Sequence, residues 1–102
     1  MDFVFGVAEF QWDEHNAVKI WQKHKVKYSE CEEIFFDTNL KILADEKHSD
    51  AENRFWALGI TKEGRRLFIV FTGRKEKIRI ISARDMNKKE RRAYHEKIEK
   101  NS

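Results

Sequence analysis

The centre of the chain alternates strand-like segments with turn signals, and this alternation restricts the possible folds more than any other feature. Residues 67–72, Leu-Phe-Ile-Val-Phe-Thr, form a nearly continuous apolar run, which is typical of a strand covered on both faces. Turn-forming residues that include a glycine precede it at 61–65 and follow it at 73–76. Similar strand patterns occur at 40–45, 53–60 and 77–83. Short turns between successive strands predict an antiparallel β-meander.

Two helices are predicted before these strands. Apolar residues recur at helical spacing over residues 14–24, after the potential N-cap Asp13. His24 is expected to place a cation at the end of this helix, near its last carbonyl groups. Ser29 and Glu32 have the spacing of a capping box, which predicts a short second helix.

A third helix is predicted at the end of the sequence. Asn87 and Glu90 form a further capping pair, and the helix continues to about Lys100. The stretch 10–12 is interpreted as a short strand that enters the fold before the first helix. The fold class is therefore α+β. We expect one compact domain over residues 1–102, with two N-terminal helices, an antiparallel meander of about four strands and a C-terminal helix.

Charge is divided unequally along the chain. The net charge is +3, but residues 1–46 hold five Lys/Arg and ten Asp/Glu, whereas residues 47–102 hold sixteen and eight. The second half also contains every arginine. Because guanidinium groups bind phosphate in a bidentate manner, this asymmetry indicates a polyanion or an acidic partner. The alternative is a solvated surface that is rich in arginine.

Cysteine and histidine usage indicates a reducing compartment and no metal site. Cys31 is the single cysteine, so no disulfide can form within the chain, and it is expected to be a buried small hydrophobe. His15, His24 and His95 lack the spacing of metal ligands, and no cofactor is expected. No segment approaches the roughly 20 apolar residues that cross a bilayer. We expect a cytoplasmic protein with no membrane partner. Core positions are expected for its three tryptophans, with partial exposure at an interface as the alternative for Trp12.

Six sequence blocks follow one another in a specific order along the chain. They are Phe10-Gln11-Trp12-Asp13 with Asn16, Lys23-His24 with Val26, Phe35-Phe36-Asp37, His48-Ser49-Asp50-Ala51-Glu52-Asn53-Arg54 with Gly59, Leu67–Thr72, and Arg79–Arg84 with Glu90-Arg91-Arg92 and Tyr94. In this order the blocks resemble the BrnT toxins of bacterial type II toxin–antitoxin systems. The resemblance covers roughly residues 9–95, and it departs from the family at Lys25, where glycine is usual. Lysine there must adopt a left-handed cap or the helix must end differently.

This resemblance implies a RelE-like fold and a ribonuclease that blocks translation. It also implies a BrnA-like antitoxin that binds DNA, so that the toxin meets operator DNA only within their complex. RNA is the implied substrate. A homodimer of the toxin within a toxin–antitoxin heterotetramer is compatible with this picture.

Metal-independent cleavage, in which the ribose 2′-OH attacks its own phosphate, requires a base, an acid and cations. Arg54, Arg79 and Arg84 are the candidate phosphate-binding residues. Arg79 and Arg84 are five positions apart, so a regular strand would not place them on one face unless a bulge or the strand end brought them together. His48 and Glu52, four positions apart, are the acid–base candidates, with their individual roles left open.

Other residues are assigned to RNA contacts or to alternative roles. Tyr94 is a candidate to stack on a base or donate a proton, and its alternative is a core position. His48 is otherwise a turn residue, and the arginines are otherwise surface ion-pair partners. The residues expected to bind RNA are Arg74, Lys77, Arg91 and Arg92.

Two further functions remain open from the sequence. The same basic surface can belong to a nucleic-acid-binding module without catalysis. It can also belong to an interaction protein that docks an acidic partner. RNA cleavage in the presence of EDTA distinguishes the metal-independent ribonuclease from both alternatives.

Overall fold

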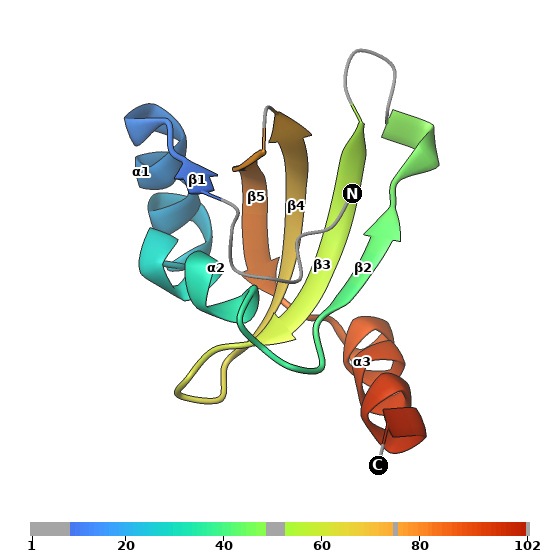
Figure 1. Ribbon diagram of the computed structural model, residues 1–102. Helices are drawn as coiled ribbons and strands as arrows, with labels where there is room; N and C mark the ends of the chain where they lie inside the picture. Colours follow the sequence, from blue (N-terminus) through green and yellow to red (C-terminus); the bar gives the residue numbers. More distant parts are fainter. Residues whose placement is uncertain (1–8, 49–52, 75, 102) are drawn as a thin grey trace.

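The computed structural model describes residues 9–48, 53–74 and 76–101 (Figure 1). In this part of the chain, helices pack on both faces of a five-stranded sheet with the order β1-β5-β4-β3-β2. The elements are β1 (Glu9–Gln11), α1 (Glu14–His24), α2 (Tyr28–Ile34), β2 (Lys41–Ala44), a 3₁₀ helix (Glu46–His48), β3 (Arg54–Ile60), β4 (Arg66–Arg74), β5 (Lys77–Asp85) and α3 (Lys88–Asn101).

The sheet confirms the predicted α+β class and adds one parallel pairing. Strands β2 to β5 form the predicted antiparallel meander. The entering strand is also present, as β1, but it runs parallel to the start of β5, with Phe10 opposite Ile78. The sheet is therefore mixed. The strand patterns could not show this, because alternation specifies buried faces and not the direction of a neighbouring strand.

Helices α1 and α2 cover one face of the sheet and form the main core. Their buried residues include Ile20, Cys31 and Ile34, which pack against alternate residues of β4 and β5 such as Ile69. Gly59 allows α2 to approach β3 closely, because a Cβ at this position would lie 2.8 Å from the Cβ of Ile34. Any larger residue at position 59 would push α2 away from the sheet.

Helix α3 covers only one end of the opposite face (Figure 1). Tyr94 packs there with Leu58 and Met86 in a second, smaller cluster. The expectation that residues 67–72 are covered on both faces is therefore wrong for part of the run. Phe68 and Val70 point to the α3 side and remain half-exposed.

The helix ends differ in detail from the expected capping. Helix α2 begins at Tyr28, and Glu30, not Glu32, accepts the N–H of Lys27, at 2.9 Å. Lys25 ends α1 in a left-handed conformation, with φ 55° and ψ 39°. The carbonyl oxygen of His24 accepts a hydrogen bond from Arg65, so Arg65 performs the capping that was expected of the His24 side chain. None of the helices in the described ranges is long and apolar enough to cross a membrane.

Candidate functional site

A β-bulge in β5 places Arg79 and Arg84 on the same face of the sheet. Val70 of β4 lies opposite Ser82, but the next residue, Phe71, lies opposite Ile80, so that Ile81 is the extra residue. One extra residue reverses the alternation beyond it. Arg79 and Arg84 therefore both point away from α1 and α2, although they are five positions apart. Arg84 lies inside the strand and not just past its end.

Asn16 of α1 holds the bulge through its side-chain amide. The Nδ2 atom donates to the carbonyl oxygen of Ile80 at 2.7 Å and also lies 3.3 Å from that of Ile81. Strand β1 reaches only as far as the pairing of Gln11 with Arg79, so among the described residues no strand neighbours the outer edge of β5 beyond this point. The amide thus replaces the missing ladder partner at the irregular residues.

We call the face opposite α1 and α2 the open face. It is formed by alternate residues of the three central strands. Two of its arginines flank Thr72, because Arg54 of β3 and Arg79 of β5 are both directly opposite this residue of β4. Two strand spacings separate their backbones by about 10 Å, which two arginine side chains can span toward one phosphate. The open face consists of Arg54, Trp56 and Leu58; Phe68, Val70 and Thr72; and Arg79, Ser82 and Arg84.

Arg84 is held in place by four contacts, one of them a hydrogen bond from its Nη1 atom to the carbonyl oxygen of Asp85 at 3.1 Å. Its guanidinium donates to both carboxylate oxygens of Glu90, at 2.8 and 2.9 Å, and lies 4.2 Å from the ring centroid of Phe68. The hydrogen bonds to Glu90 raise the pKa of Arg84 above its usual range. This arginine is therefore a fixed cation at the border between the open face and α3.

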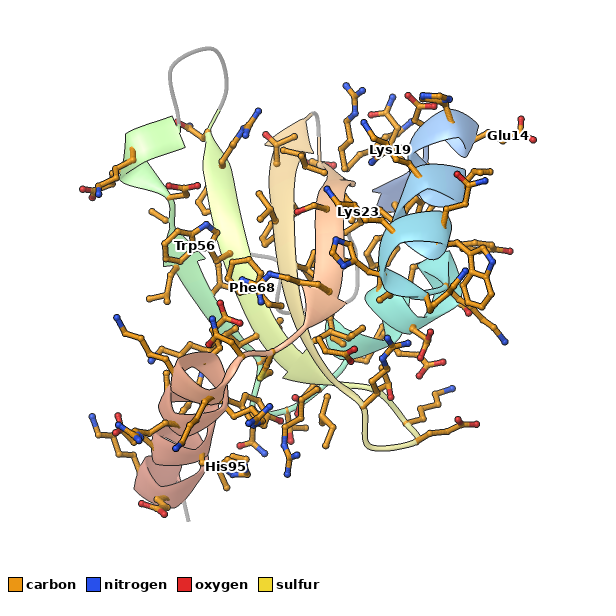
Figure 2. The ribbon with its side chains drawn as sticks, turned by 180° about the vertical axis from the view of Figure 1, so that it is seen from behind. Glu14, Lys19, Lys23, Trp56, Phe68 and His95 are labelled. Carbon is orange, nitrogen blue, oxygen red and sulfur yellow. The ribbon has the colours of Figure 1, made fainter. Side chains whose placement is uncertain are left out.

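Two lysines of α1 extend the basic surface. Figure 2 shows Lys19 and Lys23 on the side of α1 that is next to β5, one helical turn apart. They belong to residues 1–46, where acidic residues outnumber basic ones, so the charge distribution along the sequence did not indicate a contribution to the basic surface. The only signal was their spacing from Asn16, which places all three on one side of the helix.

The four residues expected to bind RNA occupy two regions. Lys77 begins β5, forms an ion pair with Glu9 at 3.9 Å and lies opposite Arg74, whose side chain is outside the described part. Arg91 and Arg92 are exposed on α3, and Arg91 donates to the carbonyl of Met86. The structure therefore brings Lys77 near the Arg54–Arg79 row and leaves Arg91 and Arg92 on the outer part of α3.

A cavity of about 380 Å³ lies between the open face and α3. Its walls are mainly apolar, and Figure 2 shows Trp56 and Phe68 on the sheet above the helix. Trp56 is half-buried here, so the expectation that it is a core residue is only partly correct. The cavity is lined by Leu43, Trp56, Leu58, Phe68, Arg84, Asn87, Lys89, Glu90 and Ala93.

Tyr94 occupies the core position that was its alternative. The residue is 1% exposed, and its hydroxyl donates to the Oδ2 atom of Asp37 at 2.5 Å. Burial, and then this hydrogen bond, raise the pKa of Tyr94. Asp37 also accepts the N–H groups of Asn39 and Ile60. Because these contacts join the turn after α2 to β3 and α3, we do not include Tyr94 among the proposed catalytic groups.

The acid–base candidates precede β3. His48 ends the 3₁₀ helix, but its side chain lies outside the described part of the structure, as does the whole of Glu52. In sequence, Glu52 stands two residues before Arg54. Among the described residues, no cluster of His, Cys, Asp and Glu has the arrangement of a metal site.

Other polar and aromatic residues have structural roles or lie elsewhere on the surface. Arg65 uses all three guanidinium nitrogens on Asp85, Glu30 and the carbonyl oxygens at the end of α1, so it stabilises the fold and is not directed at a phosphate. Cys31 is buried as expected, and burial raises the pKa of its thiol to about 12. Trp21 is 43% exposed, so the core position expected for it is wrong.

Comparison with known proteins identifies the family. The family of ribonuclease toxins, BrnT, of type II toxin–antitoxin systems matches residues 12–90, which is most of the chain. The chain belongs to the BrnT family. Among solved structures, the Brucella abortus ribonuclease toxin BrnT matches with a TM-score of 0.61 and 18% identity, covering 79% of this chain and 99% of that chain. At this identity the likeness shows the fold. None of the curated proteins matches the chain.

Membership of the BrnT family confirms the resemblance noted from the sequence blocks. A BrnT chain is a ribonuclease toxin of a type II system, which implies an RNA target and an antitoxin partner. The family match ends at Glu90, the residue that holds Arg84. The open face and the bulge therefore lie inside the matched region.

Proposed function

We propose that this BrnT chain uses the open face to cleave RNA, that the reaction requires no metal ion, and that the cleavage blocks translation. The observation that supports the proposal best is the placement of Arg54 and Arg79 on either side of Thr72, with Arg84 on the same face. Cations at these positions can neutralise the charge that gathers on phosphorus during attack by the 2′-OH. The same hydroxyl would restrict cleavage to RNA.

In this mechanism, most of the rate enhancement comes from alignment. The nucleophile belongs to the substrate, so the protein must orient the 2′-OH, the phosphorus and the leaving 5′-oxygen in line. Arg54 and Arg79 would bind the scissile phosphate. Arg84 would bind the adjacent one through the N–H groups that its contacts with Glu90 and Asp85 leave available. His48 and Glu52 are proposed as the acid–base pair, in either order of roles, because both stand in the segment that leads into Arg54.

A BrnA-like antitoxin is proposed to neutralise the toxin in the cytoplasm. The open face is cationic at its arginines and apolar around Trp56, so an antitoxin segment that combines acidic and apolar side chains would cover it best. The toxin would contact operator DNA through the DNA-binding antitoxin. A toxin homodimer would lie within a toxin–antitoxin heterotetramer.

The test is incubation of purified toxin with single-stranded RNA in excess EDTA. We expect cleavage, with 2′,3′-cyclic phosphate and 5′-hydroxyl ends, because the 2′-OH is the nucleophile. Addition of the toxin to a cell-free system should stop translation, and prior mixing with the antitoxin should prevent this. Intact RNA that is bound with a steep salt dependence would instead indicate a binding module without catalysis.

A further inference from the structure

The cavity between the sheet and α3 has an aromatic floor and a basic rim. Trp56 and Phe68 have ring centroids 5.8 Å apart, and Leu43 beside them is 40% exposed. At about 380 Å³, the cavity is within the range of sites that hold small organic groups. Apolar side chains that remain exposed beside a cationic surface indicate a ligand with both aromatic and anionic parts.

The Trp56 ring is fixed before any ligand binds. Its Nε1 atom donates to the Oδ2 atom of Asp45 at 3.1 Å, and Asp45 is buried. A ring held in this way loses little conformational entropy when a planar group stacks on it. The cavity wall at Trp56 is therefore a prepared stacking surface.

The position of the cavity relative to the arginines restricts the ligand further. Trp56 follows Arg54 by two residues on the same strand and face, a distance of about 7 Å along β3. On the other side, Arg84 and Lys89 line the cavity, and Glu90 is occupied by Arg84. A planar ring in the cavity would thus have a phosphate-binding position on each side. In a nucleic-acid strand, each nucleotide likewise has a phosphate on its 5′ side and another on its 3′ side.

We infer that this cavity binds one unstacked base of single-stranded RNA, stacked on Trp56, while the flanking phosphates lie on Arg54–Arg79 and on Arg84–Lys89. This inference rests on the proposed function and adds to it a subsite for the substrate. Bases stack on aromatic side chains with modest dependence on sequence. The base in the cavity would therefore fix the position of the strand rather than select one base strongly.

The experiment measures binding of a ten-nucleotide 2′-O-methyl RNA, which lacks the attacking hydroxyl. One nucleotide at a time is replaced by an abasic unit. With the wild-type protein, we expect one position at which loss of the base weakens binding roughly tenfold. In Trp56→Leu the same replacement should change binding less than about twofold, with an unchanged salt dependence. Trp21→Leu is the matched control, because it removes an exposed tryptophan from α1.

A milder variant keeps the test valid if Trp56→Leu does not fold. Trp56→Phe retains an aromatic ring, so the base-dependent position should persist. The quenching of tryptophan fluorescence by the oligonucleotide should be lost in Trp56→Phe and retained in Trp21→Leu. An equal quench in both variants would contradict the inference.

The outcomes separate this inference from the proposed function. If no abasic replacement weakens RNA binding to the wild-type protein, the inference of a base-binding subsite is wrong, even if RNA cleavage depends on Arg79. If one base position depends on Trp56 but RNA is never cleaved, the subsite stands and the ribonuclease mechanism fails. If Trp56→Leu impairs only neutralisation by the antitoxin, the cavity is an antitoxin contact and the inference is wrong.

Discussion

The side-chain amide of Asn16 lies 2.7 Å from the carbonyl oxygen of Ile80, at the bulge that turns Arg79 and Arg84 to the same face. Asn16 thus connects α1 to the geometry of the open face without lying on it. Removal of the amide would leave two strand carbonyls without their donor, and the bulge would be free to shift.

We predict that Asn16→Ala lowers the rate of RNA cleavage about 10- to 100-fold, because small displacements of aligned groups have large effects on rate. Single-turnover cleavage at saturating RNA, well below the melting temperature, measures this. Gln22→Ala, at an exposed position of the same helix, should leave the rate unchanged.

A double-mutant cycle distinguishes positioning from general destabilisation. If Asn16 acts through the arginines, Asn16→Ala should add little to the defect of Arg84→Ala. Fully multiplicative effects of the two substitutions on the cleavage rate would show that Asn16 acts independently of Arg84 and would contradict the positioning role.

The Tyr94 hydroxyl is predicted to stabilise the fold and not to take part in cleavage. Tyr94→Phe removes the hydrogen bond to Asp37, which should lower the free energy of unfolding by about 1–2 kcal/mol. Urea unfolding measures this change. Cleavage at low temperature should stay close to the wild-type rate, and a large loss of activity in a protein of unchanged stability would place Tyr94 in the reaction after all.

Arg65 is predicted to be structural, in contrast to the arginines of the open face. It binds Asp85, Glu30 and the carbonyl groups at the end of α1. Arg65→Ala should lower the free energy of unfolding by about 1–3 kcal/mol, since it leaves charged partners without a donor. Thermal unfolding checks this, and RNA affinity should not change when the variant is folded.

The ion pair between Arg65 and Asp85 predicts a specific dependence of stability on pH. The hydrogen bond from Arg65 lowers the pKa of Asp85 in the folded protein. A lowered pKa means that this contribution is present above the unfolded value, near 3.9, and is lost as the pH falls through the folded value. Asp85 is largely exposed, so the contribution should be below about 1 kcal/mol. Asp85→Asn should therefore reduce the difference in melting temperature between pH 7 and pH 2.5, and an unchanged difference would contradict the assignment.

The sequence was sufficient to predict the main elements of the fold. Periodicity and capping signals located α1, the meander and α3, since these signals arise from local backbone chemistry. The parallel pairing of β1 could not be predicted, because it joins Phe10 to Ile78 across most of the chain. The contact of Tyr94 with Asp37 was hidden for the same reason, as 57 positions separate them.

The candidate site was predicted in part. The spacing of Arg79 and Arg84 showed that a bulge was one way to unite them, but no local signal located the extra residue at Ile81. The helix that stabilises the bulge comes from a distant part of the sequence. Lys19, Lys23 and the exposed part of Trp56 were missed because their role depends on which face each element presents, and the amino-acid pattern specifies only that one face is buried.

The most direct test of the central claim is the single-turnover rate of RNA cleavage by Arg79→Ala in EDTA. The control is Lys62→Ala, which removes a cation from the exposed turn between β3 and β4. We predict that Arg79→Ala loses at least about 100-fold in rate, with its melting temperature preserved, and that Lys62→Ala remains within about twofold of the wild type. Cleavage by Arg79→Ala at the wild-type rate would show that the open face is not the site of the reaction.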